Sequence, residues 1–168
     1  MSAAERLAAK GLMRAGDSLS TRDRPDERHQ EFYRARPDAG AVLMAAPPWS
    51  SALGLVPDPM PALFDEQVRH LGPKVEHYSP QTLQSGANAF LLGDSVLCLG
   101  MTLDRLVFNA ELLEKCAKAF ILAHSTGARL TTIPWWVRLI AGRRLLRDER
   151  FAAECHAEGK VPVFKSAY

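Results

Sequence analysis

The sequence predicts an α/β domain of about three layers, and three observations lead to this prediction. Short apolar runs that suit buried strands, such as 41–44 and 96–99, alternate along the chain with segments of helical periodicity. One of these segments, which follows Thr102, is a long helix with a broad apolar face. The length of 168 residues suits one domain with a proper core. Such alternation is typical of a sheet flanked by helices.

Composition and charge narrow the class of protein. Apolar residues make up 47% and charged residues 24% of the chain, which is ordinary for a globular protein, and a net charge of +2 gives no reason to expect nucleic acid. No apolar run approaches the roughly 20 residues that a membrane span needs, and the N-terminus lacks a signal-peptide core. Cys98, Cys116 and Cys155 are far apart and lack CxxC spacing, so we expect unpaired thiols and a cytoplasmic protein.

In the first half of the chain, helical and strand-like segments are separated by polar and proline-rich loops. Pro25 and Asp26 favour the start of a helix that runs to about Ala35, because proline and acidic residues suit a first helical turn. The other expected elements are a helix over 3–13, a polar loop over 16–22, a buried strand over 41–44, loop and short helix around the prolines of 47–61, a helix over 62–71 and a strand over 75–78.

The second half begins with a predicted hairpin and the most clearly marked helix. The strands 90–92 and 96–99 are joined by Gly93, Asp94 and Ser95, all of which are turn formers. Thr102 then caps a helix that ends near Gly127, with favourable pairs Glu111–Lys115 and Glu114–Lys118 four residues apart. A further helix is expected over 135–147, and an irregular tail over 157–168.

Three stretches carry a family pattern in the same order along the chain. They are GLMRAGDSLSTR (11–22), HQEFYRARPDAGAVLMAAPPWSSALGL (29–55) and DSVLCLGMTLDRLVFNAELLEKCAKAFILAHSTG (94–127). Together they resemble the class II aldolase/adducin family. The resemblance covers about 5–135 and implies a three-layer sandwich in one domain, 1–168, with 136–168 as a C-terminal helix and tail. It also implies a homo-oligomer, a tetramer or a dimer.

The sequence departs from this family pattern at the positions of the metal ligands and of the acid/base residue. The paired metal-binding histidines of the family fall at Met44 and Ala46, the third at Asp94, and the acid/base glutamate at Pro25. A thioether, a methyl group and one carboxylate do not make a site for a divalent cation. Only six residues separate Arg22 from His29, where the family has several dozen, so we expect a truncated central sheet. We therefore expect no metal and no cofactor.

The resemblance still predicts a ligand-binding surface at the cleft of the family, even without the metal ligands. Its expected lining is mostly apolar with a single acid, which suits a small hydrophobic or amphipathic organic ligand, and comprises Met44, Ala46, Trp49, Asp94 and Cys98. Asp94 is either a surviving acid or a turn former, since aspartate often bonds nearby backbone in tight turns. The loop residues Ser18, Ser20 and Arg22 either bind an oxyanion or form an ordinary loop–helix junction.

Three functions follow from these residues. The favoured one is a non-catalytic, metal-free oligomeric module that binds a small ligand or a partner enzyme. The second is a metal-independent lyase, isomerase or cyclase in which Asp94 acts with His29, His77 or Tyr168. The third is a rebuilt metal site, but the five histidines show no HxH, HxxxH or HExxH spacing.

An aromatic and basic segment follows Pro134. Its members are Trp135, Trp136, Arg138, Arg143, Arg144 and Arg147. Such a helix can lie at a membrane interface or bind a partner, but burial in the core or in a subunit contact is the favoured interpretation because apolar residues surround much of the helix.

Overall fold

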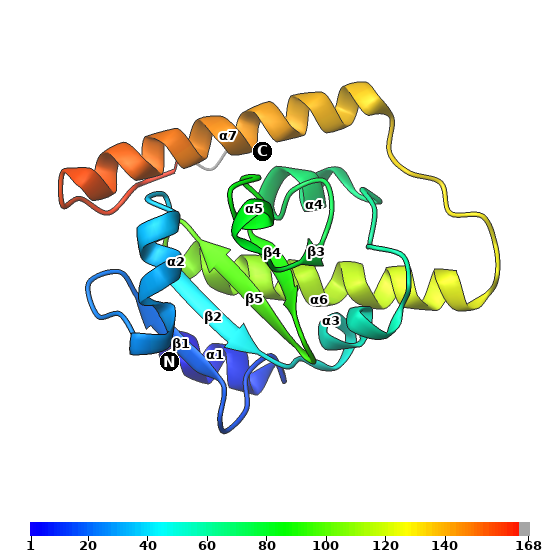
Figure 1. Cartoon of the computed structure of the whole chain (residues 1–168), viewed down its shortest axis with the longest axis horizontal. Helices are drawn as coiled ribbons and strands as arrows, with labels where there is room; N and C mark the ends of the chain where they lie inside the picture. Colours follow the sequence, from blue (N-terminus) through cyan, green and yellow to red (C-terminus); the bar gives the residue numbers. More distant parts are fainter. Residues whose placement is uncertain (165–168) are drawn as a thin grey trace.

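The computed structural model describes residues 1–164, and a mixed five-stranded sheet lies at its centre (Figure 1). The strand order is β1-β2-β5-β4-β3. Neighbouring strands are antiparallel except β3 and β4, which are parallel. The strands are β1 (Ser18–Thr21), β2 (Ala41–Ala45), β3 (Glu76–His77), β4 (Ala89–Leu92) and β5 (Ser95–Gly100). The predicted α/β class is confirmed.

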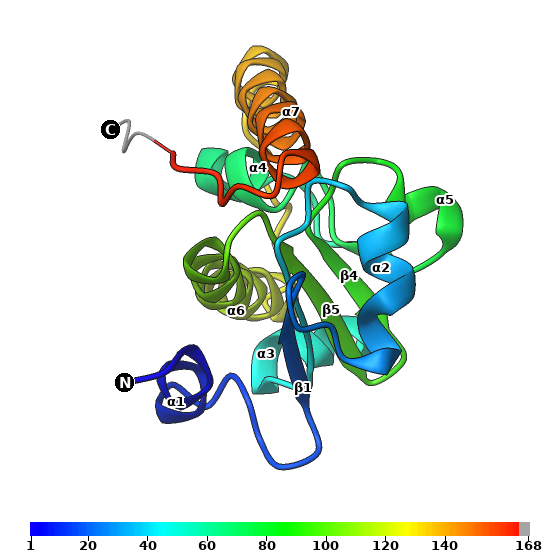
Figure 2. The ribbon, with the colours of Figure 1, turned by 90° about the vertical axis from the view of Figure 1, so that its left-hand side faces the viewer.

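Helices cover both faces of this sheet (Figure 2). Helix α6 packs on one face together with α1 and α3, while α2 and α5 lie on the other face; α7 packs against α4 along one margin. The α-helices are α1 (Ala3–Ala9), α2 (Gln30–Ala35), α3 (Pro48–Ala52), α4 (Asp65–His70), α5 (Pro80–Leu83), α6 (Leu103–Ser125) and α7 (Trp135–Ala157), and the short 3-10 turns are η1 (Glu27–His29) and η2 (Leu53–Leu55).

Alternation along the strands divides the core between the two faces. Leu43 and its register partner Cys98 point toward α1 and α6, whereas Val42 and Leu99 point toward α2. This follows from the two-residue period of a strand. Both layers are well buried, so the sheet holds an apolar layer on each side.

Helix α6 matches its prediction, but its acidic residues do not act as expected. The Thr102 hydroxyl caps it by accepting from the Arg105 amide at 3.1 Å, and Gly127 follows it with a φ of +70°. Glu111 pairs with Lys10 of α1 at 2.7 Å instead of with a lysine of its own helix. Glu114 accepts backbone hydrogen bonds from α3. Tertiary contacts thus replace the predicted pairs within α6.

Two other predictions are corrected. The stretch 16–22 contains strand β1 instead of a polar loop, because the Ser18 and Ser20 hydroxyls find partners inside the protein. Helix α7 continues ten residues beyond 147, because a stripe of inward-facing residues that includes Leu145 and Ala152 continues along it. Within residues 1–164 no helix has the length and apolar character that crossing a membrane requires.

Candidate functional site

An open hollow lies beside the β4–β5 turn and includes Asp94, one of the residues of the predicted cleft. Its volume is about 500 Å³. The lining comprises Pro48, Ser51, Ala52, Gly54, Leu55, Gly93 and Asp94. Asp94 is exposed, and within the described residues its carboxylate accepts no hydrogen bond from the protein. The turn therefore does not need this side chain, which is left available to a ligand.

The other predicted lining residues do not gather around Asp94. Met44 points toward α2 and packs with Leu97 and Phe90, whereas Cys98 is fully buried on the opposite face, under α1 and α6. Burial raises the pKa of the Cys98 thiol to about 12. The predicted single lining is therefore wrong in its geometry: the hollow contains Asp94 but neither Met44 nor Cys98.

Trp49 belongs to a contact between helices. Its backbone amide donates to Glu114 Oε1 at 2.8 Å, and the Ser50 amide donates to Glu114 Oε2 at 2.9 Å. The Lys118 ammonium lies 5.6 Å from the centroid of the Trp49 ring. The Glu114 carboxylate thus satisfies the first amides of α3, and Trp49 packs toward α6. Ala46 is half-buried between β2 and α3.

The serines of the predicted oxyanion loop are held by one buried histidine. His29 is fully buried, and its Nε2 and Nδ1 lie 2.7 Å from Ser18 Oγ and Ser20 Oγ, respectively. The Tyr33 hydroxyl donates to the Ser20 carbonyl at 2.8 Å. Burial lowers the pKa of His29, which favours the neutral ring. The serine hydroxyls of β1 therefore have hydrogen-bond partners inside the protein.

Arg22, the third member of that loop, serves the end of α2. Its guanidinium donates to the carbonyls of Ala39 (2.7 Å), Tyr33 (3.1 Å) and Arg36 (2.7 Å), and it lies 5.2 Å from the centroid of the Tyr33 ring. These bonds satisfy carbonyls that the helix leaves free. The side chains of Ser18, Ser20 and Arg22 are thus engaged inside the protein, and Ser18 and Ser20 belong to strand β1 instead of to a loop–helix junction.

The predicted acid/base partners of Asp94 are also dispersed. His29 lies in the interior next to β1, and His77 is exposed on β3, at the opposite edge of the sheet. Tyr168 lies outside the described residues. The structure therefore brings neither described histidine to the hollow that contains Asp94.

The residues that the resemblance assigns to metal positions do not fit a metal ion. Met44 offers a thioether inside an apolar layer, Ala46 offers no donor atom, and Asp94 stands alone on the rim of the hollow. Across residues 1–164, no three His, Cys, Asp or Glu side chains lie close enough together to hold a metal ion. The donor set is unsuited to zinc, which needs three or four nitrogen, sulfur or oxygen ligands.

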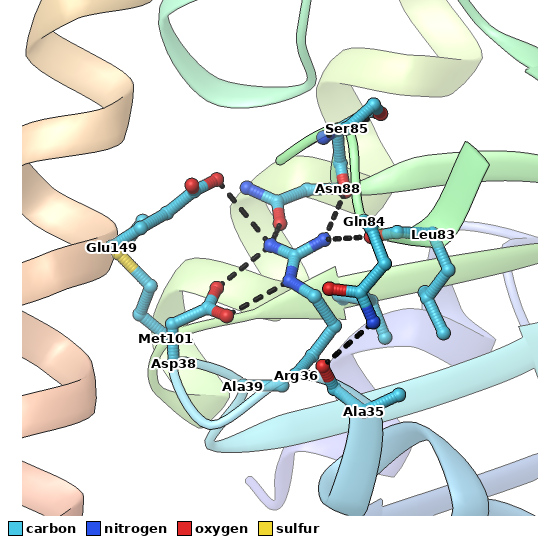
Figure 3. A network of polar contacts seen from close by, with 12 residues as sticks. Ala35, Arg36, Asp38, Ala39, Leu83, Gln84, Ser85, Asn88, Met101 and Glu149 are labelled. Carbon is cyan, nitrogen blue, oxygen red and sulfur yellow. Dashed lines mark hydrogen bonds and ion pairs between the residues drawn. The ribbon is translucent and has the colours of Figure 1, made fainter. Parts of the chain in front are cut away.

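A buried polar network, which sequence reasoning missed, joins α7 to the segments that follow α2 and precede β4 (Figure 3). Arg36 is 4% exposed and donates to both oxygens of Asp38, at 2.8 and 2.7 Å. The same guanidinium contacts Asn88 Oδ1 at 2.9 Å and Glu149 Oε1 at 3.3 Å. Burial raises the pKa of Glu149 to about 8. The Arg36 guanidinium lowers this pKa, but the nearby carboxylates of Asp38 and Asp148 raise it and oppose the effect of the arginine.

Further polar contacts next to this network hold α7 against the rest of the protein. Asp148 accepts from Arg69 at 2.6 Å, and the His156 Nε2 lies 3.0 Å from the Met101 carbonyl. In the same region Arg105 Nη1 lies 2.6 Å from His70 Nδ1, and burial with the nearby arginine lowers the pKa of His70 to about 4. The spacing of Arg36 and Asp38 was visible in the sequence, but nothing in it indicated a partner 113 residues away.

Comparison with solved structures shows what this arrangement resembles. An L-fuculose 1-phosphate aldolase from Glaciozyma antarctica superposes with a TM-score of 0.68 at 14% identity, over 94% of this chain and 87% of that chain. YgbL from Klebsiella pneumoniae, a putative aldolase/epimerase/decarboxylase, gives 0.66 at 16% identity, over 83% and 93%. Another L-fuculose 1-phosphate aldolase gives 0.59 at 20% identity, and this chain covers 61% of its length. The chain has a class II aldolase-like fold.

This similarity is one of fold. No family model and no curated protein matches the sequence. Identities of 14 to 20% accompany the superpositions above, so they establish the architecture and leave the chemistry to the residues of this chain.

Proposed function

We propose that this chain is a non-catalytic, metal-free class II aldolase-like protein that binds a small amphipathic ligand or a partner in an oligomer. The observation that carries this proposal is where the residues assigned to the metal positions lie in the structure. Met44 is built into the apolar layer beneath α2, and Asp94 alone reaches the hollow. A single carboxylate on an open, mostly apolar surface suits binding better than the stabilisation of a developing charge.

The chemistry of the hollow defines the ligand class. Asp94 offers a negative charge, Ser51 offers a hydroxyl, and Leu55, 87% exposed, provides apolar surface at the rim. The α3 amides that face Glu114 are already satisfied, so they do not attract an anion. We therefore expect a ligand with an apolar body and an amine or hydroxyl donor directed at Asp94.

Amide NMR spectra recorded with a fragment library of such amines and alcohols test this proposal. We expect binding fragments to shift amides of residues 49–55 and 93–94, and Asp94→Asn to weaken binding about tenfold, because the charge-assisted bond is lost. Asp58→Asn, which removes another exposed acid from the neighbouring loop, is the matched control and should bind normally.

The rival function, a metal-independent lyase, isomerase or cyclase, makes a different prediction for the same variant. Turnover of a small oxygenated compound that Asp94→Asn abolishes, with unfolding unchanged, would replace the proposed function with catalysis. Fragments that shift residues elsewhere and leave the hollow unaffected would also contradict the proposal.

A further inference from the structure

Helix α7 leaves a long, uncovered side turned toward solvent. Trp135 is 68% exposed and Trp136 is 54% exposed, and four more large apolar side chains of the helix are at least 43% exposed: Leu139, Ile140, Leu146 and Phe151. Figures 1 and 2 show α7 along one margin of the molecule, with α4 on its inner side and no described helix or strand over its outer side. The tryptophans therefore do not belong to the core of the single chain, whereas the expected subunit contact stays a prediction.

One line of residues defines what we call the outer face of α7. Spacings of three and four residues place them on one side of the helix, opposite Ala141, Leu145 and Ala152, which are buried. The members of the outer face are Trp136, Leu139, Ile140, Arg143, Arg147, Arg150 and Glu154. Its first half is thus apolar and aromatic, and its second half is mostly basic.

The acids of α7 do not neutralise this face. Asp148 and Glu149 are each 8% exposed and turn inward, toward Arg69 and Arg36. Arg147 is 76% exposed, and its Nε lies 3.9 Å from Asp148 Oδ1. This distance is long for an ion pair, so the pair is weak. Glu154 is the one acid of the helix that is exposed within the described residues, and it lies on the outer face, four residues after Arg150. The outer face therefore carries three arginines against one acid and is net positive.

This charge decides between the possible occupants. A second copy packed on the same face would bring six arginines together with only two acids, one Glu154 from each copy, which opposes self-association. A bilayer that contains anionic lipid satisfies both halves of the face. Tryptophan favours the headgroup region, and arginine binds phosphate while its stem lies along apolar surface. The straight helix is about 34 Å long and offers no groove, which suits a flat partner.

We propose that the outer face of α7 docks this protein onto an anionic phospholipid surface. Trp136, Leu139 and Ile140 insert among the headgroups, and Arg143, Arg147 and Arg150 contact the lipid phosphates. The helix lies in the plane of the membrane and does not cross it. This inference concerns a surface separate from the hollow at Asp94, so either can fail without the other.

Vesicle co-sedimentation of the full chain tests the inference. We expect binding to vesicles of phosphatidylcholine mixed with phosphatidylglycerol and little binding to phosphatidylcholine alone, with the bound fraction falling as salt rises. The double variant Arg143→Gln/Arg147→Gln should weaken binding by about tenfold or more, and Trp136→Ser should weaken it and abolish a blue shift of tryptophan emission.

The matched control removes the same charge elsewhere. Arg14→Gln/Arg24→Gln changes two exposed arginines in the loops on either side of β1, outside α7, and should bind like the wild type. Circular dichroism confirms that each variant is folded. The inference is overturned if the protein ignores anionic vesicles, if the control loses binding as much as the α7 variant does, or if Trp136→Ser splits a dimer while vesicle binding stays unchanged.

Discussion

Glu149 is a buried acid whose titration affects the stability of this fold. It shares the Arg36 guanidinium with Asp38, and Asp38 already takes a two-bond contact, so Glu149 gains little charge compensation at its buried position. Its pKa of about 8 lies well above its ordinary value of 4.5, so the folded state favours the neutral acid. The stabilising effect is complete below pH 4.5 and is lost as pH rises toward 8.

Glu149→Gln should therefore change the pH dependence of stability. Each pH unit across this window removes about 1.4 kcal/mol from the wild type through this group, and glutamine cannot ionise. Urea unfolding of both proteins, measured from about pH 6 to about pH 8, should show the wild type losing stability relative to the variant. Glu154→Gln, an exposed position on the same helix, is the control and should track the wild type. Parallel curves for Glu149→Gln and the wild type would contradict this interpretation.

Residue-scale predictions from the sequence succeeded only where neighbours along the chain decide the outcome. The Thr102 cap and Gly127 were predicted because their partners lie within a few residues. The partners of Glu111 and Glu114 were assigned wrongly, since Lys10 and the α3 amides reach them through the fold. His29 was considered as a catalytic partner of Asp94, and the structure gives it two buried serine partners.

At the scale of elements, the junction between β5 and α6 tolerates no side chain at Gly100. A Cβ built there would lie 2.4 Å from the Leu106 backbone nitrogen and 2.5 Å from its Cα. Backbone atoms cannot move aside as the end of a flexible side chain can, so strand and helix would have to separate. This close approach lets α6 start directly against the sheet and bury Leu106 and Leu113.

Gly100→Ala should destabilise the protein by at least about 2 kcal/mol, since overpacking at a rigid contact costs this much or more. Gly142→Ala is the matched control: a Cβ there meets nothing within 4 Å, and alanine favours the helix, so stability should rise by up to about 1 kcal/mol. Thermal or chemical unfolding of the two variants checks both signs. Similar stability for Gly100→Ala and the wild type would show that this junction is looser than described.

Elements with a clear period were predictable, and those decided by polar burial were not. The hairpin of β4 and β5 and the helix α6 followed from apolar runs, turn residues and caps. Strand β1 was missed because Ser18 and Ser20 are polar residues that are typical of a loop. Only the fold brings His29 to their hydroxyl groups and allows these serines to be buried in a strand. The second half of α7 was missed because its charged residues hide the buried stripe of Leu145 and Ala152.

At the scale of the whole molecule, the sequence predicted the architecture better than the site. Helices on both faces of a mixed sheet follow from the order of elements, and the solved aldolases share that arrangement. The site depends on which face each strand residue takes. Met44 and Cys98 point in opposite directions from paired strands, so they do not line one cleft, and only Asp94 of the predicted lining reaches the hollow.

The proposed loss of the metal site also belongs to the whole molecule, because its positions come from β2 and from the β4–β5 turn. Elemental analysis of protein purified without chelators measures it directly. We expect zinc, manganese and iron each far below one ion per chain, and the same thermal unfolding before and after treatment with a chelator. Close to one such ion per chain, lost in Asp94→Ala, would contradict a metal-free aldolase-like protein.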